Sequence, residues 1–138
     1  MNKDFAHSTI FLTVEQVLKI HEMQLKAFGG SEGIRDYAGL ASAIEQPKST
    51  YGGDDLYPSV FDKAAVYAFH ISQAQAFVDG NKRTGLHACL TFLAVNDKPL
   101  PECAELEDWM NSFATKEKTK DEFSDFLRDL FIKSFTGN

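Results

Sequence analysis

Apolar residues recur every three or four positions through most of the chain, which is the period of an amphipathic helix. Thr13 and Gln16 have the form of a capping box, and a glycine pair at 29–30 supplies a stop, so a first helix is predicted over 14–28. A second helix is predicted from Asp36 to the residue before Pro47, because the residue that precedes a proline avoids helical geometry. Further helices are predicted over about 59–76, 83–95, 104–114 and 121–134.

The segment 48–58 lacks this period. It contains Tyr51, Gly52, Gly53 and Pro58, and such residues favour turns, so we predict an exposed loop or a short hairpin. The helix predicted over 59–76 is apolar over most of its circumference, which is typical of a central, buried helix. The chain contains no internal repeat and no long linker. We therefore predict an all-α fold of about six helices in a single domain, residues 1–138.

The composition changes this picture only by excluding classes of protein. With 43% hydrophobic residues among 138, the chain has enough apolar material for a packed core, which excludes a disordered chain. Its net charge of −6, from 14 Lys and Arg against 20 Asp and Glu, argues against binding nucleic acid through a basic face. No apolar run approaches the roughly 18 residues of a membrane span, and residues 1–7 do not resemble a secretion signal. Cys89 and Cys103 fit no CxxC spacing, so we expect reduced thiols in a cytoplasmic protein.

The segment 75–83 is the candidate site, because a polar, glycine-containing break separates two apolar helices there. The first turn of a helix has unpaired N–H groups and a partial positive charge, and it therefore attracts anions. Gly80 lies directly before that turn and would let a phosphate approach the main chain closely. Asn81 adds a side-chain amide. Lys82 and Arg83 add two cations, of which the arginine has the planar fork that suits phosphate.

Asp79 lies among these groups and is placed to bind Mg²⁺, a hard cation that prefers carboxylate and phosphate oxygens. The simpler interpretation is a turn followed by a solvated helix face. Two cations at a helix N-terminus oppose the helix dipole, however, and this favours a bound anion. On the residues alone, both interpretations remain open.

The segment 77–83, Phe-Val-Asp-Gly-Asn-Lys-Arg, resembles the signature loop of the Fic/Doc (Fido) family, His-x-Phe-x-Asp/Glu-Gly/Ala-Asn-Gly/Lys-Arg. Flanking stretches at 29–36, 40–47 and 57–65 are similar to the Doc (death-on-curing) branch. The resemblance implies the single-domain Fido fold and assigns roles to the loop. Asp79 would coordinate Mg²⁺, Gly80 and Asn81 would form the anion hole, and Arg83 would bind a nucleotide phosphate.

Lys82 stands where most Fic proteins have glycine, and this lysine is typical of the Doc branch. A side chain there would obstruct the phosphate pocket used for nucleotidyl transfer. The resemblance therefore implies a toxin of a toxin–antitoxin pair that transfers the terminal phosphate of ATP, with Mg²⁺, to a hydroxyl of a protein target. AMP transfer is the less favoured alternative. Precedent in the branch points to the translation machinery as the target.

A cognate antitoxin protein is the partner that the resemblance implies. The chain lacks the Ser/Thr-x-x-x-Glu pattern of the inhibitory helix found in many Fic proteins, so control by a separate chain is expected. The segment 48–58 corresponds to the family's flap, which aligns the target protein by strand-like pairing. Tyr51, Gly52 and Gly53 are its candidate contact residues, with simple packing as the alternative role for Tyr51.

Gln75 departs from the family pattern, because it stands where the family has its catalytic histidine, the general base. An amide has no useful basicity near neutral pH. Phosphoryl transfer depends mainly on positioning and charge stabilisation, so two hypotheses stay open: an attenuated enzyme, and a catalytically silent pseudoenzyme that binds a nucleotide or a partner. Among the other histidines, His70 should point away from Gln75, His21 is interpreted as structural, and His87 shares the helix face of Arg83.

Overall fold

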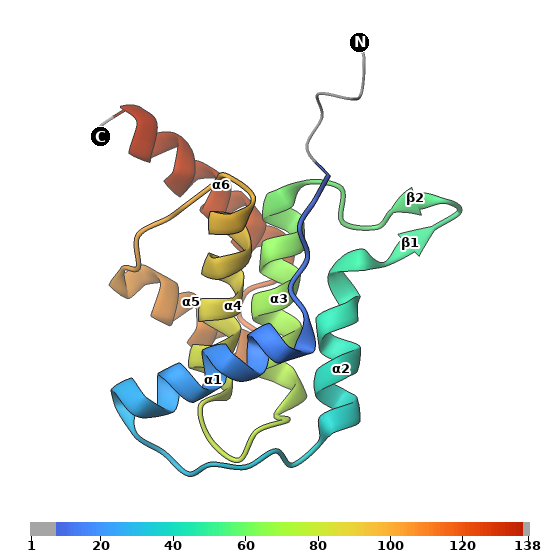
Figure 1. Ribbon diagram of the computed structural model, residues 1–138. Coiled ribbons are helices and arrows are strands. Elements are labelled where there is room, and N and C mark those ends of the chain that lie inside the picture. Colours follow the sequence, from blue (N-terminus) through green and yellow to red (C-terminus); the bar gives the residue numbers. More distant parts are fainter. Residues whose placement is uncertain (1–7, 137–138) are drawn as a thin grey trace.

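A computed structural model describes residues 8–136 of the chain. These residues form six α-helices and little strand, which confirms the all-α prediction (Figure 1). A short 3-10 helix, η2 (Gln46–Lys48), and a hairpin of β1 (Thr50–Tyr51) and β2 (Asp54–Asp55) connect the second helix to the third. The helices are α1 (Val14–Phe28), α2 (Tyr37–Glu45), α3 (Val60–Ala74), α4 (Asn81–Val95), α5 (Ala104–Thr115) and α6 (Lys120–Thr136).

Side-chain caps set the starts of four helices. At α6, Thr119 Oγ1 accepts from Glu122 N at 3.1 Å and Glu122 Oε1 accepts from Thr119 N at 2.8 Å. Thr13 and Gln16 form the predicted capping box of α1, in which each side chain bonds the main-chain N–H of the other. Ser59 and Asp62 cap α3 in the same way, and the carboxylate of Asp36 caps α2. These short-range hydrogen bonds explain why the helix starts at 14 and 37 agree with the sequence prediction.

Three predicted boundaries are wrong by two residues: the last helix, α6, continues to Thr136 instead of ending at 134, and the other two boundaries lie next to the candidate site. α3 ends at Ala74, before the predicted residue 76, because Gln75 adopts a left-handed conformation that no helix continues. α4 begins at Asn81, before the predicted residue 83. Pro47 ends α2 as predicted, but the chain continues as η2, because a proline fits the first turn of a 3-10 helix.

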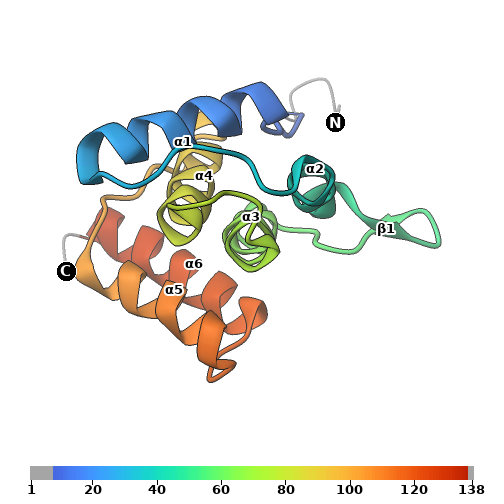
Figure 2. The same cartoon turned by 90° about the horizontal axis from the view of Figure 1, so that it is seen from below.

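The helices pack in layers, as Figure 2 shows. α3 and α4 pack against each other in the middle, α1 and α2 lie on one side of them, and α5 and α6 lie on the other. The hairpin projects away from the helices beyond α2 (Figures 1 and 2). None of the helices in the described part of the chain is long and apolar enough to cross a membrane.

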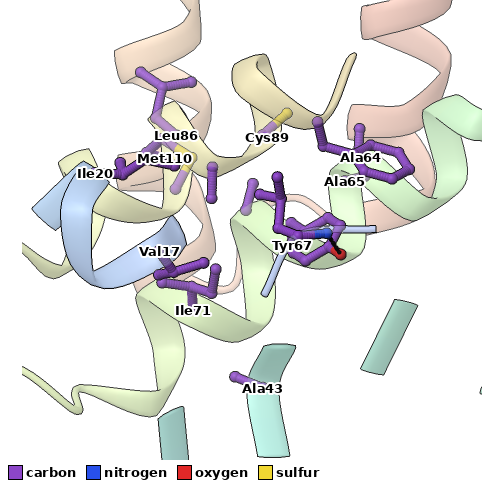
Figure 3. Packing of buried hydrophobic residues seen from close by; sticks show 14 of the residues in the cluster. Val17, Ile20, Ala43, Ala64, Ala65, Tyr67, Ile71, Leu86, Cys89 and Met110 are labelled. Carbon is purple, nitrogen blue, oxygen red and sulfur yellow. Dashed lines mark hydrogen bonds between the residues drawn. The ribbon is translucent and has the colours of Figure 1, made fainter. Parts of the chain in front are cut away.

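The core surrounds α3, which confirms the prediction that this helix is central and buried. Val17 of α1, Ile71 of α3 and Leu86 of α4 are among the buried side chains that meet there (Figure 3). Tyr67 of α3 is also fully buried, and its hydroxyl accepts a hydrogen bond from Leu12 N at 2.9 Å. Burial raises the pKa of Tyr67 to about 12. The packed pair of α3 and α4 forms a rigid base for the loop that joins them.

Candidate functional site

The candidate site lies on the α3–α4 loop, residues 75–80, at the lower end of the two central helices in Figure 1. Gln75 ends α3 with φ of 52°, in the left-handed region. Gly80, the N-cap residue that precedes α4, has φ of 82°. These two left-handed residues reverse the chain, so that α4 returns alongside α3.

The segment between α1 and α2, residues 29–36, runs beside this loop and fixes its main chain. Ala76 O accepts a hydrogen bond from Arg35 N at 2.6 Å, and Val78 N donates to Gly33 O at 3.0 Å. The two segments thus pair over a short distance as antiparallel strands do. The loop is therefore held by main-chain bonds that do not depend on the identity of its side chains.

Asn81 closes the loop onto the start of α4. Its side chain is 8% exposed, Oδ1 accepts from Phe77 N at 3.0 Å, and Nδ2 donates to Phe77 O at 2.9 Å. Phe77 itself is fully buried. In this structure the side-chain amide of Asn81 holds the loop main chain. A contribution of Asn81 to an anion hole stays a prediction, and it would come from the main-chain N–H.

His21 supports the loop from α1, which agrees with its interpretation as a structural residue, although the sequence did not indicate which part of the fold it holds. Its ring stacks on Phe77, with centroids 3.7 Å apart and planes at 7°. Its Nε2 lies 2.8 Å from Asp79 O, so Nε2 must carry a proton and donate to that carbonyl. The contact joins residues 58 positions apart, and a local sequence pattern contains no signal for it.

Asp79 is exposed at the outer side of the loop. Its Oδ2 accepts a hydrogen bond from Ser31 N at 2.8 Å, while Oδ1 has no hydrogen-bond partner among residues 8–136. Within the same residues, no three His, Cys, Asp or Glu side chains gather into a metal site. One free carboxylate oxygen fits Mg²⁺, because this ion binds proteins through one or two carboxylates and completes its shell with water and phosphate oxygens.

α4 begins without a side-chain cap. Thr84 N makes the first main-chain hydrogen bond of the helix, to Gly80 O at 3.0 Å, so the helix itself provides no acceptor for the N–H groups of residues 81–83. A Cβ at Gly80 would lie in ordinary contact with His21, 3.5 Å from Cδ2. The positive φ of Gly80 is by itself enough to favour glycine here, and the close phosphate approach that the sequence suggested stays a prediction. The uncapped, positively polarised turn has the chemistry of an anion site.

The two cations of the site lie against α5 and the segment that precedes it. Lys82 Nζ donates to Asn111 Oδ1 at 2.9 Å. Arg83 Nη2 donates to Glu102 Oε2 at 3.0 Å, and Nη1 donates to Glu107 Oε2 at 3.4 Å. The structure thus places both cations in the first turn of α4, but it pairs each with a group that the sequence pattern did not identify.

Gln75 is exposed, and its side chain turns back onto α3. Nε2 donates to Ser72 O at 2.8 Å, so the side-chain amide binds one of the last carbonyl groups of α3. A neutral amide in this place offers no base.

The two other histidines within residues 8–136, His70 and His87, lie on the flanks of the two central helices. His70 lies against α6, where its Nε2 is 3.1 Å from Lys120 Nζ. Burial and, to a lesser extent, the charge of Lys120 lower the pKa of His70 to about 4. His87 Nε2 lies 3.3 Å from Glu102 Oε1, beside the ion pair of Arg83. The position of His70 agrees with the prediction that it points away from Gln75.

The predicted flap is a β-hairpin in which β1 and β2 pair antiparallel. Gly52 and Gly53 have φ of 60° and 89°, and two consecutive positive φ values are required by the tight turn that suits a hairpin. Tyr51 is 82% exposed, so it does not pack against the helices. The three candidate contact residues therefore lie together at the exposed tip.

Lys63 of α3 holds the base of this hairpin from inside the protein. It is only 3% exposed, and its Nζ donates to Asp55 Oδ2 at 3.1 Å and to the carbonyl oxygens of Tyr57 and Pro58. A buried ammonium needs such partners. The hairpin is consequently tied to the same helix that ends at Gln75.

Comparison with known proteins identifies the family. A sequence model of the Fic/DOC family matches residues 11–93, a range that includes α1, the hairpin and the α3–α4 loop. The chain is also similar to Toxin Doc of Mycolicibacterium smegmatis (strain ATCC 700084 / mc(2)155), with 36% identity over 132 residues that cover 94% of this chain and 99% of that protein. This chain belongs to the Fic/DOC family.

Proposed function

We propose that this chain is a Doc-like toxin that transfers the terminal phosphate of ATP, bound with Mg²⁺, to a hydroxyl group of a protein. The observation that carries the proposal is the uncapped first turn of α4, which Asp79 precedes and which contains Lys82 and Arg83. The likeness to a protein named Toxin Doc supports a toxin.

The first turn of α4 would bind the phosphates of the nucleotide. The N–H groups of residues 81–83 point out of the helix start, and the helix dipole favours negative charge there. Arg83 adds a guanidinium that bonds phosphate oxygens in pairs. Asp79 Oδ1 would hold Mg²⁺, which supplies positive charge to bridge phosphate oxygens during transfer.

In the transfer, the oxygen of the target hydroxyl forms a bond to the terminal phosphorus, and the bond from this phosphorus to the bridging oxygen breaks, which leaves ADP. The proton of the hydroxyl goes to a phosphate oxygen or to water, because Gln75 cannot accept it. The absence of a general base typically lowers the rate by about 10²–10⁴-fold. We therefore infer a slow enzyme, whose chain contributes position and positive charge.

Lys82 would determine which group of the nucleotide is transferred, and the hairpin would determine which protein segment receives it. By the resemblance, the side chain of Lys82 obstructs the arrangement used for AMP transfer, so transfer of the terminal phosphate is favoured. The exposed edge of the hairpin has free main-chain groups to which an extended target segment can pair. An antitoxin as partner, a target in the translation machinery and a place in the cytoplasm, where ATP is available, belong to the same proposal and rest on the likeness to Toxin Doc.

A catalytically silent nucleotide-binding protein is the second candidate function. The observation that favours it is the Gln75 side chain, which bonds Ser72 O and carries no base. The two candidates share the binding site and differ only in turnover.

Labelled ATP distinguishes these candidates. The chain is incubated with a cell extract and either γ-labelled or α-labelled ATP, next to Gln75→His and to Gln73→His, a matched control at an exposed position of α3 outside the loop. We expect γ-label in protein with the wild-type chain, faster labelling with Gln75→His, and no change with Gln73→His. Labelling only with Gln75→His supports the silent binder, α-label in protein supports AMP transfer, and no labelling by any variant contradicts the proposed transfer.

A further inference from the structure

Arg83 is surrounded by groups of its own chain. Its Nη1 and Nη2 donate to Glu107 and Glu102, its Nε donates to Gln24 Oε1 at 3.4 Å, and its Cζ lies 3.5 Å from the centre of the Phe28 ring. The side chain is 24% exposed. In this structure the guanidinium is therefore not free to bind an external anion.

The two glutamates come from one stretch of the chain. Glu102 precedes α5, and Glu107 lies in its first turn, where the helix dipole stabilises a negative charge. Asn111, one turn further along α5, accepts from Lys82 Nζ. The start of α5 thus contacts both cations of the candidate phosphate site.

A carboxylate and a phosphate compete for the same N–H groups of an arginine, because each presents a pair of anionic oxygens that can accept two N–H bonds from its planar fork. Glu102 and Glu107 occupy one N–H on each terminal nitrogen of Arg83. Their charges also repel a polyphosphate that approaches the start of α4. Both side chains are partly in water, 38% and 57% exposed, so they can leave Arg83 by rotation of their own side chains.

We propose that Glu102 and Glu107, here named the acidic clamp, occupy on Arg83 the place of a nucleotide phosphate and thereby set the affinity of the site. This inference rests on the proposed function. Binding of the nucleotide displaces the carboxylates, and the first turn of α4 and Asp79 keep their positions because the loop is held by His21, Asn81 and the segment 29–36. The clamp therefore lowers affinity without being part of the phosphate site.

The test removes the charges of the clamp and keeps the shape of its side chains. The double variant Glu102→Gln with Glu107→Gln is compared with the wild-type chain and with Glu105→Gln combined with Asp108→Asn. This control removes the same net charge from exposed positions of α5, and neither residue pairs with Arg83. Calorimetry measures the dissociation constants of a non-hydrolysable ATP analogue with Mg²⁺ and of inorganic pyrophosphate.

We expect the clamp variant to bind both probes at least about tenfold more tightly than the wild type, since an anion no longer has to displace a charged partner of Arg83. The control should stay close to the wild type. Single substitutions should fall between, which keeps the proposal testable if the double variant does not fold. Equal or weaker binding by the clamp variant, with measurable binding by the wild type, overturns the clamp alone. Absence of binding in every protein overturns the proposed function together with it.

Discussion

The residues in and around the α3–α4 loop divide into those that hold its main chain and those with polar atoms free for a ligand. Asn81 and His21 belong to the first group, since both bind main-chain atoms of the loop. Asp79 belongs to both, since Oδ2 accepts from Ser31 N and Oδ1 has no such partner within residues 8–136. Motif spacing predicts Asp79 and Asn81, because it is local in sequence. It does not predict His21, which reaches the loop only through tertiary packing.

Replacing His21 with Phe tests the support of the loop. Phe retains a ring to stack on Phe77 but cannot donate to Asp79 O. We expect the free energy of unfolding to fall by about 1–3 kcal/mol, since a part-buried carbonyl loses its partner, and Mg²⁺-dependent binding of an ATP analogue to weaken. Thermal denaturation and calorimetry at several Mg²⁺ concentrations measure the two effects. A loss of stability with unchanged Mg²⁺ dependence would restrict His21 to a structural role.

Among the elements, the hairpin and α3 are coupled through a buried lysine. The glycine pair at 52–53 predicts the turn from the sequence, because the need for positive φ is local. The burial of Lys63 cannot be predicted in the same way, since a single charged residue in an apolar helix is usually solvated. Its partners, Asp55 and the main chain of Tyr57, come into contact with Lys63 only when the hairpin folds against α3.

Lys63→Met should release the hairpin and leave α3 folded. Met has a similar length and lacks the ammonium that binds Asp55 and two carbonyl groups. We expect faster amide hydrogen exchange in residues 50–56, with unchanged protection in α3, because the hairpin loses its tie and the helix keeps its core. Lys48→Met is the matched control, since Lys48 forms an exposed pair with Glu45 that contributes little. Equal exchange in both variants would show that Lys63 does not hold the hairpin.

At the scale of the whole molecule, the sequence predicts the type and number of helices better than their arrangement. Helical period and caps such as Thr13 are encoded locally, whereas the layers depend on which helix faces match. The contact of Arg83 with Glu102 and Glu107 depends on how α5 packs beside α4, and no spacing in the sequence indicates it. The loop motif thus locates the site, and the packing determines what each of its cations touches.

The stability of the whole fold should depend on pH through His70, which joins α3 to α6. Burial, with a smaller contribution from Lys120, lowers the pKa of His70 from 6.5 to about 4. Between these two pH values the unfolded chain binds a proton at His70 that the folded chain does not bind. The contribution of uncharged His70 to the free energy of unfolding is therefore fully present above pH 6.5 and is lost as the pH falls towards 4. We expect His70→Gln to lose less Tm than the wild type between neutral pH and about pH 5, measured by calorimetry. Equal losses in the two proteins would remove His70 as a cause.

The central claim is that the uncapped start of α4 receives the phosphates of a nucleotide, with Mg²⁺ on Asp79. A crystal structure of the chain with Mg²⁺ and a non-hydrolysable ATP analogue tests it most directly. The account predicts phosphate oxygens at the N–H groups of residues 81–83, the metal at Asp79 Oδ1, and Arg83 turned from Glu102 and Glu107 to a phosphate. An empty helix start, with Arg83 still paired to both glutamates at saturating analogue, would contradict it.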